Sequence, residues 1–112
     1  MFKPFKKLIR HIMGINIRKV MADQTKTVGD RVKIAILWQK GFDNPNPGSI
    51  ADPKNTNMAD YDFSHEDYLE ITEHFNITID TEKPGANPLN DADVEAFTTV
   101  QDCIDGVNDA IK

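Results

Sequence analysis

The sequence predicts an all-α domain built as a small helical bundle. Apolar residues recur at helical spacing in three separate segments, and each segment begins at a Ser or Thr that can cap a helix. A run rich in Pro, Asn, Asp and Gly separates the first segment from the second. Because the chain has 112 residues, it has room for one such domain and for no deep two-lobed cleft.

A basic N-terminal tail, residues 1–22, precedes the predicted domain at residues 23–112. Its first twenty positions hold no acid and six bases: Lys3, Lys6, Lys7, Arg10, Arg18 and Lys19. The tail is expected to be either disordered or an amphipathic helix, and a basic amphipathic helix suits a membrane surface or a partner groove. Arg10 and His11 interrupt its apolar run, so we expect neither a secretion signal nor a membrane span.

The rest of the chain is strongly acidic, with 18 acids against seven bases after Val20. A nucleic-acid binder needs basic charge to neutralise phosphates, so this balance argues against a nucleic-acid partner and favours basic proteins or small molecules. A single cysteine, Cys103, excludes an intramolecular disulfide and leaves too few thiolates for a structural zinc site. A reducing compartment, the cytoplasm, is the expected location, and the protein is expected to be a soluble monomer.

The first helix is predicted to open at Thr27 and to run to about Lys40. The Thr27 hydroxyl can cap the helix, and Asp30, three residues on, completes a capping box. Gly41 follows where a left-handed C-cap is expected. A long loop then covers residues 42–61, where three prolines forbid a regular helix. Loops of this length in small domains are usually functional or mobile.

The second helix is predicted to start near Ser64 and to end near Phe75 or Asn76. Ser64 supplies a side-chain acceptor at the N-cap, and acids follow in the first turn, where the helix dipole favours them. Tyr68 and Ile71 share the apolar side with Phe75. The opposite side forms an acidic ridge, made of Glu66, Glu70 and Glu73.

The remaining residues are predicted to form a connection and two further helical pieces. Residues 76–90 are expected to be a connection in which Ile77 and Ile79 alternate as in a short strand. Residues 90–97 allow a helical turn or two. The last helix is expected to begin at Thr98, with Gln101 completing its capping box. The apolar positions of the three main helices predict a core of Val32, Ile36, Tyr68, Ile71, Phe75, Val100, Ile104 and Val107.

The sequence offers no group of residues that would form a catalytic or metal centre. His65, Glu66 and Asp67 are adjacent, so on a helix they fan out instead of converging. His74 lies about 180° from His65 around the same helix, and all four are expected to be solvated surface residues. Cys103 sits beside the apolar side of the last helix and is expected to be a buried, inert thiol. We therefore do not expect an enzyme.

Two blocks near the end of the chain, EHFNITID and DADVEAFTTVQDCID, resemble the acyl carrier protein family. The family commonly closes its second helix with Glu-x-Phe and an Ile-x-Ile pair, has an acidic short third helix, and enters its last helix through a Phe-Thr-Thr-Val step. The matching residues are Glu73, Phe75, Ile77 and Ile79, then Asp91, Asp93 and Glu95, then Phe97, Thr98, Thr99 and Val100. GDRVKIAIL, residues 29–37, is similar to the family's first helix, and the resemblance covers roughly Thr27 to Ile111.

The resemblance implies an acyl-carrier-like four-helix bundle with a long first loop and a short third helix. Its prosthetic 4'-phosphopantetheine arm would carry acyl groups as thioesters in a specialised fatty acid or lipid pathway. A phosphopantetheinyl transferase would attach the arm. The acidic second helix would be read by basic patches on acyl-transfer or lipid-synthesis enzymes, and Glu66, Glu70 and Glu73 would be the docking residues.

The attachment point departs from the family pattern. The family uses a Ser in an Asp-Ser-Leu triplet at the start of the second helix, and the sequence contains no such triplet. Alignment without gaps from Phe75 places Tyr61 there. Alignment by DYLEI, residues 67–71, brings Ser64 within one residue of the attachment point, with His65 in the place of Leu. Two alternatives remain: a carrier modified on Ser64, or a degenerate carrier fold without the arm that acts as an unmodified interaction module.

Overall fold

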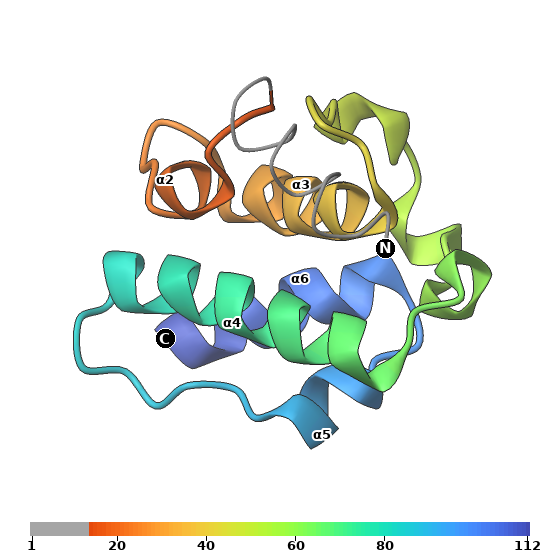
Figure 1. The fold of residues 1–112 in the computed structure, drawn as a ribbon. Coiled ribbons are helices and arrows are strands. Elements are labelled where there is room, and N and C mark those ends of the chain that lie inside the picture. Colours follow the sequence, from red (N-terminus) through yellow and green to blue (C-terminus); the bar gives the residue numbers. More distant parts are fainter. Residues whose placement is uncertain (1–13) are drawn as a thin grey trace.

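The computed structural model describes residues 14–112. Within this range it contains five α-helices and no β-strand, so the all-α prediction is confirmed. The helices are α2 (Ile17–Met21), α3 (Val28–Lys40), α4 (His65–Glu82), α5 (Asp91–Glu95) and α6 (Val100–Ile111). In Figure 1, α4 runs through the middle of the molecule, with α2 and α3 on one side and α5 on the other. It contacts all four of the other helices.

Helix α2 lies inside the stretch that we predict to be a tail. Asn16 caps it by accepting a hydrogen bond from the Lys19 amide at 3.2 Å. Ile17 and Met21 are buried and belong to the hydrophobic core. The packed domain therefore begins before the predicted boundary at residue 23, and the expectations for residues 1–13 lie outside the described residues.

Helix α3 spans the predicted residues, but only the Thr27 side-chain half of the predicted capping box forms. The Thr27 hydroxyl accepts a hydrogen bond from the Asp30 amide at 3.0 Å. Gly41 ends the helix with a φ of 120°, a conformation that side chains with a Cβ rarely adopt. The long loop after it contains three short 3-10 turns at Pro47–Ser49, Pro53–Asn55 and Met58–Tyr61.

The long loop is packed against the rest of the domain. Ile50 and Met58 are both buried in the core. The Met58 amide donates to the Thr98 carbonyl, and the Val100 amide donates to the Thr56 carbonyl, both at 2.9 Å. These two bonds hold the loop along the start of α6, so its shape is determined by backbone pairing as well as by side-chain burial.

Helix α4 continues to Glu82, beyond the predicted end near Asn76, and the alternation of Ile77 and Ile79 belongs to this helix rather than to a strand. β-branched residues have modest helix propensity, but tertiary packing overrides it here. Thr78 and Ile79 are each 1% exposed, and the Thr78 hydroxyl donates to the Met21 carbonyl of α2 at 2.8 Å. The predicted connection over residues 76–90 is therefore too long at its N-terminal end.

Two short-range caps start the last helices. Asn90 and Asp93 form a capping box for α5, and Thr99 and Asp102 form one for α6. The α6 cap lies one residue later than the predicted Thr98. Because the Thr98 carbonyl is paired with the loop, this residue stays outside the helix and Thr99 takes the cap position.

The predicted core is largely confirmed. Seven of its eight residues are buried, while Tyr68 is only partly buried and packs against the cluster. Tyr68 makes an edge-on contact with the Phe63 ring at 5.8 Å between centroids, which holds it near the surface. The structure adds buried residues from the tail, the loop and α5: Ile17, Met21, Ile50, Met58 and Val94.

A buried arginine joins three helices. Arg31 on α3 is 1% exposed. Its guanidinium donates to the Met21 carbonyl at 3.3 Å, to the Thr27 carbonyl at 3.4 Å and to the Glu82 carboxylate. A charge this deep is tolerated only when its donors are satisfied, so these bonds link α2, α3 and the end of α4.

Candidate functional site

Ser64 stands at the N-cap of α4 with its side chain exposed. The hydroxyl accepts a hydrogen bond from the Asp67 amide at 3.2 Å, and the Asp67 carboxylate accepts one from the Ser64 amide at 2.9 Å. This reciprocal capping box fixes the orientation of both side chains. Because the hydroxyl here only accepts, its proton remains available to another acceptor.

The chain segment before Ser64 is held by aromatic stacking. Tyr61 and Phe63 stack with ring centroids 5.4 Å apart, and Asp62 between them adopts a left-handed backbone with φ of 53°. Lys40 donates to the Tyr61 carbonyl at 2.8 Å. Burial raises the pKa of the Tyr61 phenol above its usual value of 10.0. The gap-free alternative, Tyr61, is therefore stacked and partly buried, so its hydroxyl is less accessible than that of the exposed Ser64.

His65, next to Ser64, connects the start of α4 to α5. Its Nδ1 lies 2.8 Å from a Glu95 carboxylate oxygen. The hydrogen bond that the His65 ring donates to the Glu95 carboxylate, together with the negative charge of Glu95, raises the pKa of His65 above the ordinary 6.5, and Asp91 and Glu66 add to the effect. His65 is a surface residue, as predicted. The His65 side chain is 66% exposed and the Glu95 side chain 35%, so the pair adds little stability.

This contact gives a testable pH dependence. The His65 imidazole is expected to titrate above 6.5 in a proton NMR titration, and Glu95→Gln is expected to lower its pKa toward 6.5. Because the folded-state pKa is raised, the small stabilisation is complete below the unfolded pKa and is lost as the pH rises through the folded value. Glu66→Gln is the matched control and should shift the pKa less. An unchanged pKa in Glu95→Gln would contradict the assignment.

The acidic ridge is partly neutralised. Glu66 is exposed. Glu70 accepts a hydrogen bond from the side-chain amide nitrogen of Gln39 at 2.9 Å, and Glu73 pairs with Arg18 of α2. The Arg18–Glu73 pair is itself exposed at the surface. Sequence reasoning missed both partners, because the residues involved lie far from the ridge along the chain. Within residues 14–112, Glu66 and Glu70 are consequently the ridge carboxylates that form no ion pair.

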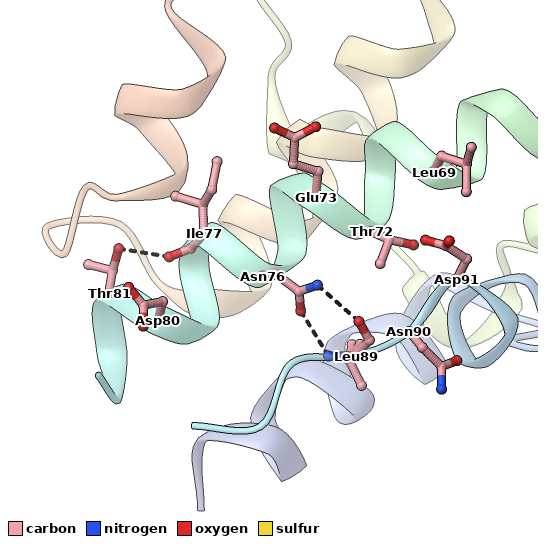
Figure 2. Close-up of a pocket in the computed structure, with 10 residues that line it drawn as sticks. All are labelled: Leu69, Thr72, Glu73, Asn76, Ile77, Asp80, Thr81, Leu89, Asn90 and Asp91. Atoms are coloured by element: carbon pink, nitrogen blue, oxygen red, sulfur yellow. Dashed lines mark hydrogen bonds between the residues drawn. The ribbon is translucent and has the colours of Figure 1, made fainter. Parts of the chain in front are cut away.

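A surface pocket of about 630 Å³ lies between α4 and residues 89–91. Figure 2 shows Asn76 at its centre, with its amide oxygen accepting from the Leu89 amide and its amide nitrogen donating to the Leu89 carbonyl, both at 2.9 Å. These two bonds fix the connection against α4 and so form one wall of the pocket. Sequence analysis did not find this pocket, which begins at Leu69, five residues along the helix from Ser64.

The other chemical candidates lie apart from Ser64. His74 is 7% exposed, so the prediction of a solvated His74 is wrong; it lies on the buried side of α4, which points away from the exposed His65. Cys103 is fully buried, and desolvation raises the pKa of its thiol to about 12. This confirms the buried thiol. Within residues 14–112, no three His, Cys, Asp or Glu side chains gather in a way that could hold a metal ion.

The fold and this site together define an all-α domain with an exposed serine at the start of its longest helix. No helix in the described part of the chain has the length and apolar character needed to cross a membrane. No family model matches the chain, and neither the curated proteins nor the solved structures contain a match to it.

Proposed function

We propose that the protein is an acyl-carrier-like protein that tethers acyl intermediates on a 4'-phosphopantetheine arm attached to Ser64. The observation that carries the proposal is the exposed Ser64 hydroxyl at the N-terminus of α4, directly after the long loop. The order of helices supports it, because α3, the long loop, α4, the short α5 and α6 follow the order that the family resemblance implies. Tyr61 is the weaker candidate, since it is stacked and partly buried.

The residues around Ser64 fit the arm. A phosphodiester on the Ser64 oxygen would lie at the start of α4, where helix amides and the helix dipole favour negative charge. The thiol of the arm would supply the thioester chemistry. The pocket that begins at Leu69 offers apolar contacts for a carried chain through Leu69, Ile77 and Leu89. The protein's own part is to hold and present the group, so tethering rather than catalysis is its mechanism.

Partners are proposed to be enzymes of acyl transfer or lipid synthesis with basic patches. Glu66 and Glu70 lie on the exposed side of α4 within two turns of Ser64, so a basic surface bound there would also reach the serine. Glu73 contributes to docking when a cation of the partner takes the place of Arg18 beside its carboxylate. A reducing location, the cytoplasm, suits the single buried Cys103.

A second function is supported by one specific observation. Ser64 already has a complete structural role, because its hydroxyl and the Asp67 carboxylate form both halves of a capping box. A serine used only as a cap would belong to a carrier-like fold without the arm that acts as an unmodified interaction module. The two functions differ in whether the Ser64 oxygen ever carries a phosphodiester.

The test is intact-mass measurement of the full chain after incubation with coenzyme A and a phosphopantetheinyl transferase. The expected result is a gain of one phosphopantetheine group, mapped to Ser64 by peptide sequencing. The rate should be low, because His65 replaces an apolar residue whose burial against a transferase would be worth roughly 1.5–3 kcal/mol. Absence of the added mass with several transferases, and in protein purified from its own host, would favour the unmodified module.

Charge reversal of the ridge tests the docking face. Glu66→Lys with Glu70→Lys is expected to raise the KM for loading by a basic transferase about tenfold at low salt, with kcat little changed. The physical reason is that the cationic partner loses its steering field. Glu66 lies in the first turn of α4, so its reversal should also cost about 0.3–1 kcal/mol of stability.

The matched control for this pair is reversal of two exposed acids outside α4, Asp52→Lys with Asp105→Lys. This variant changes net charge equally and should leave the KM near the wild-type value. Glu73→Lys is measured separately, because it would also repel Arg18. An equal rise in KM for both double variants would mean that net charge, not the ridge, governs docking.

A further inference from the structure

Two pockets share one lining residue, Leu89. The first is the pocket of Figure 2, between α4 and residues 89–91. The second, of about 520 Å³, lies between Leu89, α5 and α6. Together they form one surface, which we name the acidic groove. Its apolar lining consists of Leu69, Ile77, Leu89, Ala96, Phe97 and Ala110.

Negative charge surrounds this apolar lining. The carboxylates that line the groove are Glu73, Asp80, Asp91, Asp93 and Asp109, and among residues 14–112 no Lys, Arg or His lines either pocket. Of these five, Glu73 pairs with a cation of α2 and Asp109 with the terminal Lys112. An apolar surface bordered by acids fits an occupant that has both basic and apolar side chains and no acid.

The chain carries such a segment in residues 1–13, outside the part that the structure describes. Its bases are Lys3, Lys6, Lys7 and Arg10, and it has no acid. Its larger apolar residues at helical spacing are Phe5, Leu8, Ile9 and Ile12. The formal charge is therefore +4 for residues 1–13 and −9 for residues 14–112, with His neutral.

The segment is long enough to reach the groove. The chain enters the described region just before α2, and Arg18 of α2 bonds Glu73 at the border of the groove. Thirteen residues span about 20 Å as a helix and up to about 45 Å when extended, and the longest extent of the molecule is 40 Å. A tethered segment also has an effective concentration on the order of millimolar, so binding within one chain outcompetes binding between dilute chains.

We infer that residues 1–13 bind the acidic groove of their own chain, with the bases beside its carboxylates and the apolar side chains over Leu69, Ile77 and Leu89. This self-interaction needs no arm on Ser64; where the proposed carrier function holds, residues 1–13 compete with the carried acyl chain for Leu69, Ile77 and Leu89. It covers a surface next to the acidic ridge, so it competes with any basic partner that extends along α4 toward α5.

Paramagnetic relaxation in the full chain tests the inference. A spin label is attached to a cysteine introduced by Lys6→Cys; the native Cys103 is buried and should not react. Amide signals of Leu89, Asn90 and Asp91 are expected to lose most of their intensity, whereas that of Asn55 in the long loop should keep it. Raising the salt to about 1 M should restore the lost signals, because the Debye length falls to about 3 Å.

Charge variants inside and outside the groove distinguish binding at the groove from a general effect of net charge. Asp80→Asn with Asp91→Asn should restore most of the signal of Leu89, whereas Asp52→Asn with Asp60→Asn, which alters two exposed acids outside the groove, should not. In a mixture of spin-labelled chain with isotope-enriched chain that has no spin label, the amide signals of the enriched chain should keep their intensity. Loss in this mixture would mean that a second copy is bound. If the amide signals of Leu89, Asn90 and Asp91 keep their intensity in the spin-labelled full chain, the inference is wrong. This holds whether or not the chain binds phosphatidylserine vesicles.

Discussion

Arg31→Met is expected to lower the free energy of unfolding by about 3–5 kcal/mol, a large share of the stability of a domain of this size. The substitution removes the guanidinium bonds to the Met21 and Thr27 carbonyls and the partner of Glu82. Both carbonyls keep another donor, the Thr78 hydroxyl and the backbone amide of residue 31, so the cost comes from losing hydrogen bonds to a charged donor, about 1.5–3 kcal/mol each. The measurement is the midpoint of urea unfolding, followed by circular dichroism.

The other arginine–glutamate pair is a matched control. Arg18 and Glu73 are both exposed, so Arg18→Met should change stability by at most about 1 kcal/mol. The pH adds a second check, because the hydrogen bond from Arg31 lowers the pKa of Glu82 below 4.5. The stability that this ion pair contributes is fully present above pH 4.5 and is lost as the pH falls through the lowered pKa of Glu82. Equal effects of the two arginine variants would contradict the structural role of Arg31.

Ser64→Ala is expected to abolish loading by a phosphopantetheinyl transferase completely. The reason is chemical, since alanine has no oxygen to form the phosphodiester. It also removes the cap on the Asp67 amide, at a cost of about 1 kcal/mol. Intact mass after incubation with coenzyme A measures the first effect, and urea unfolding measures the second.

Two further variants distinguish the role of the Ser64 hydroxyl as attachment point from its role as helix cap. Ser64→Asp keeps an N-cap acceptor, so it should retain most of the stability and still not load. The chain has one other serine, Ser49, and Ser49→Ala should load like the wild type. Loading of Ser64→Ala or of Ser64→Asp would place the attachment elsewhere and reject the carrier function in this form.

Helix starts were the features that the sequence predicted best. Thr27 and Ser64 cap α3 and α4 as expected, and Gly41 ends α3. Each of these interactions joins residues at most four positions apart, so the side chains that decide it are visible together in the sequence. The helical spacing of the apolar residues was equally informative, and it identified seven buried core positions correctly.

Errors arose where distant residues decide the outcome. The end of α4 depends on Thr78 bonding to Met21 of α2, and the start of α6 depends on the loop that pairs with Thr98. His74 is buried because of the elements that cover its side of α4, which helical spacing alone does not reveal. The same limit hid the pocket, whose wall is held by the Asn76–Leu89 bonds.

The amino-acid sequence by itself determined the all-α class, the helix starts, the core positions and the exposed serine at the head of α4. Only the tertiary structure decided that residues 17–21 belong to the core, that Arg18 neutralises Glu73 and that Arg31 bonds Glu82. Those two ion pairs join residues 55 and 51 positions apart. Local hydrogen bonds and periodicity act within a few residues, whereas burial and ion pairing depend on which distant segments the packed core brings together.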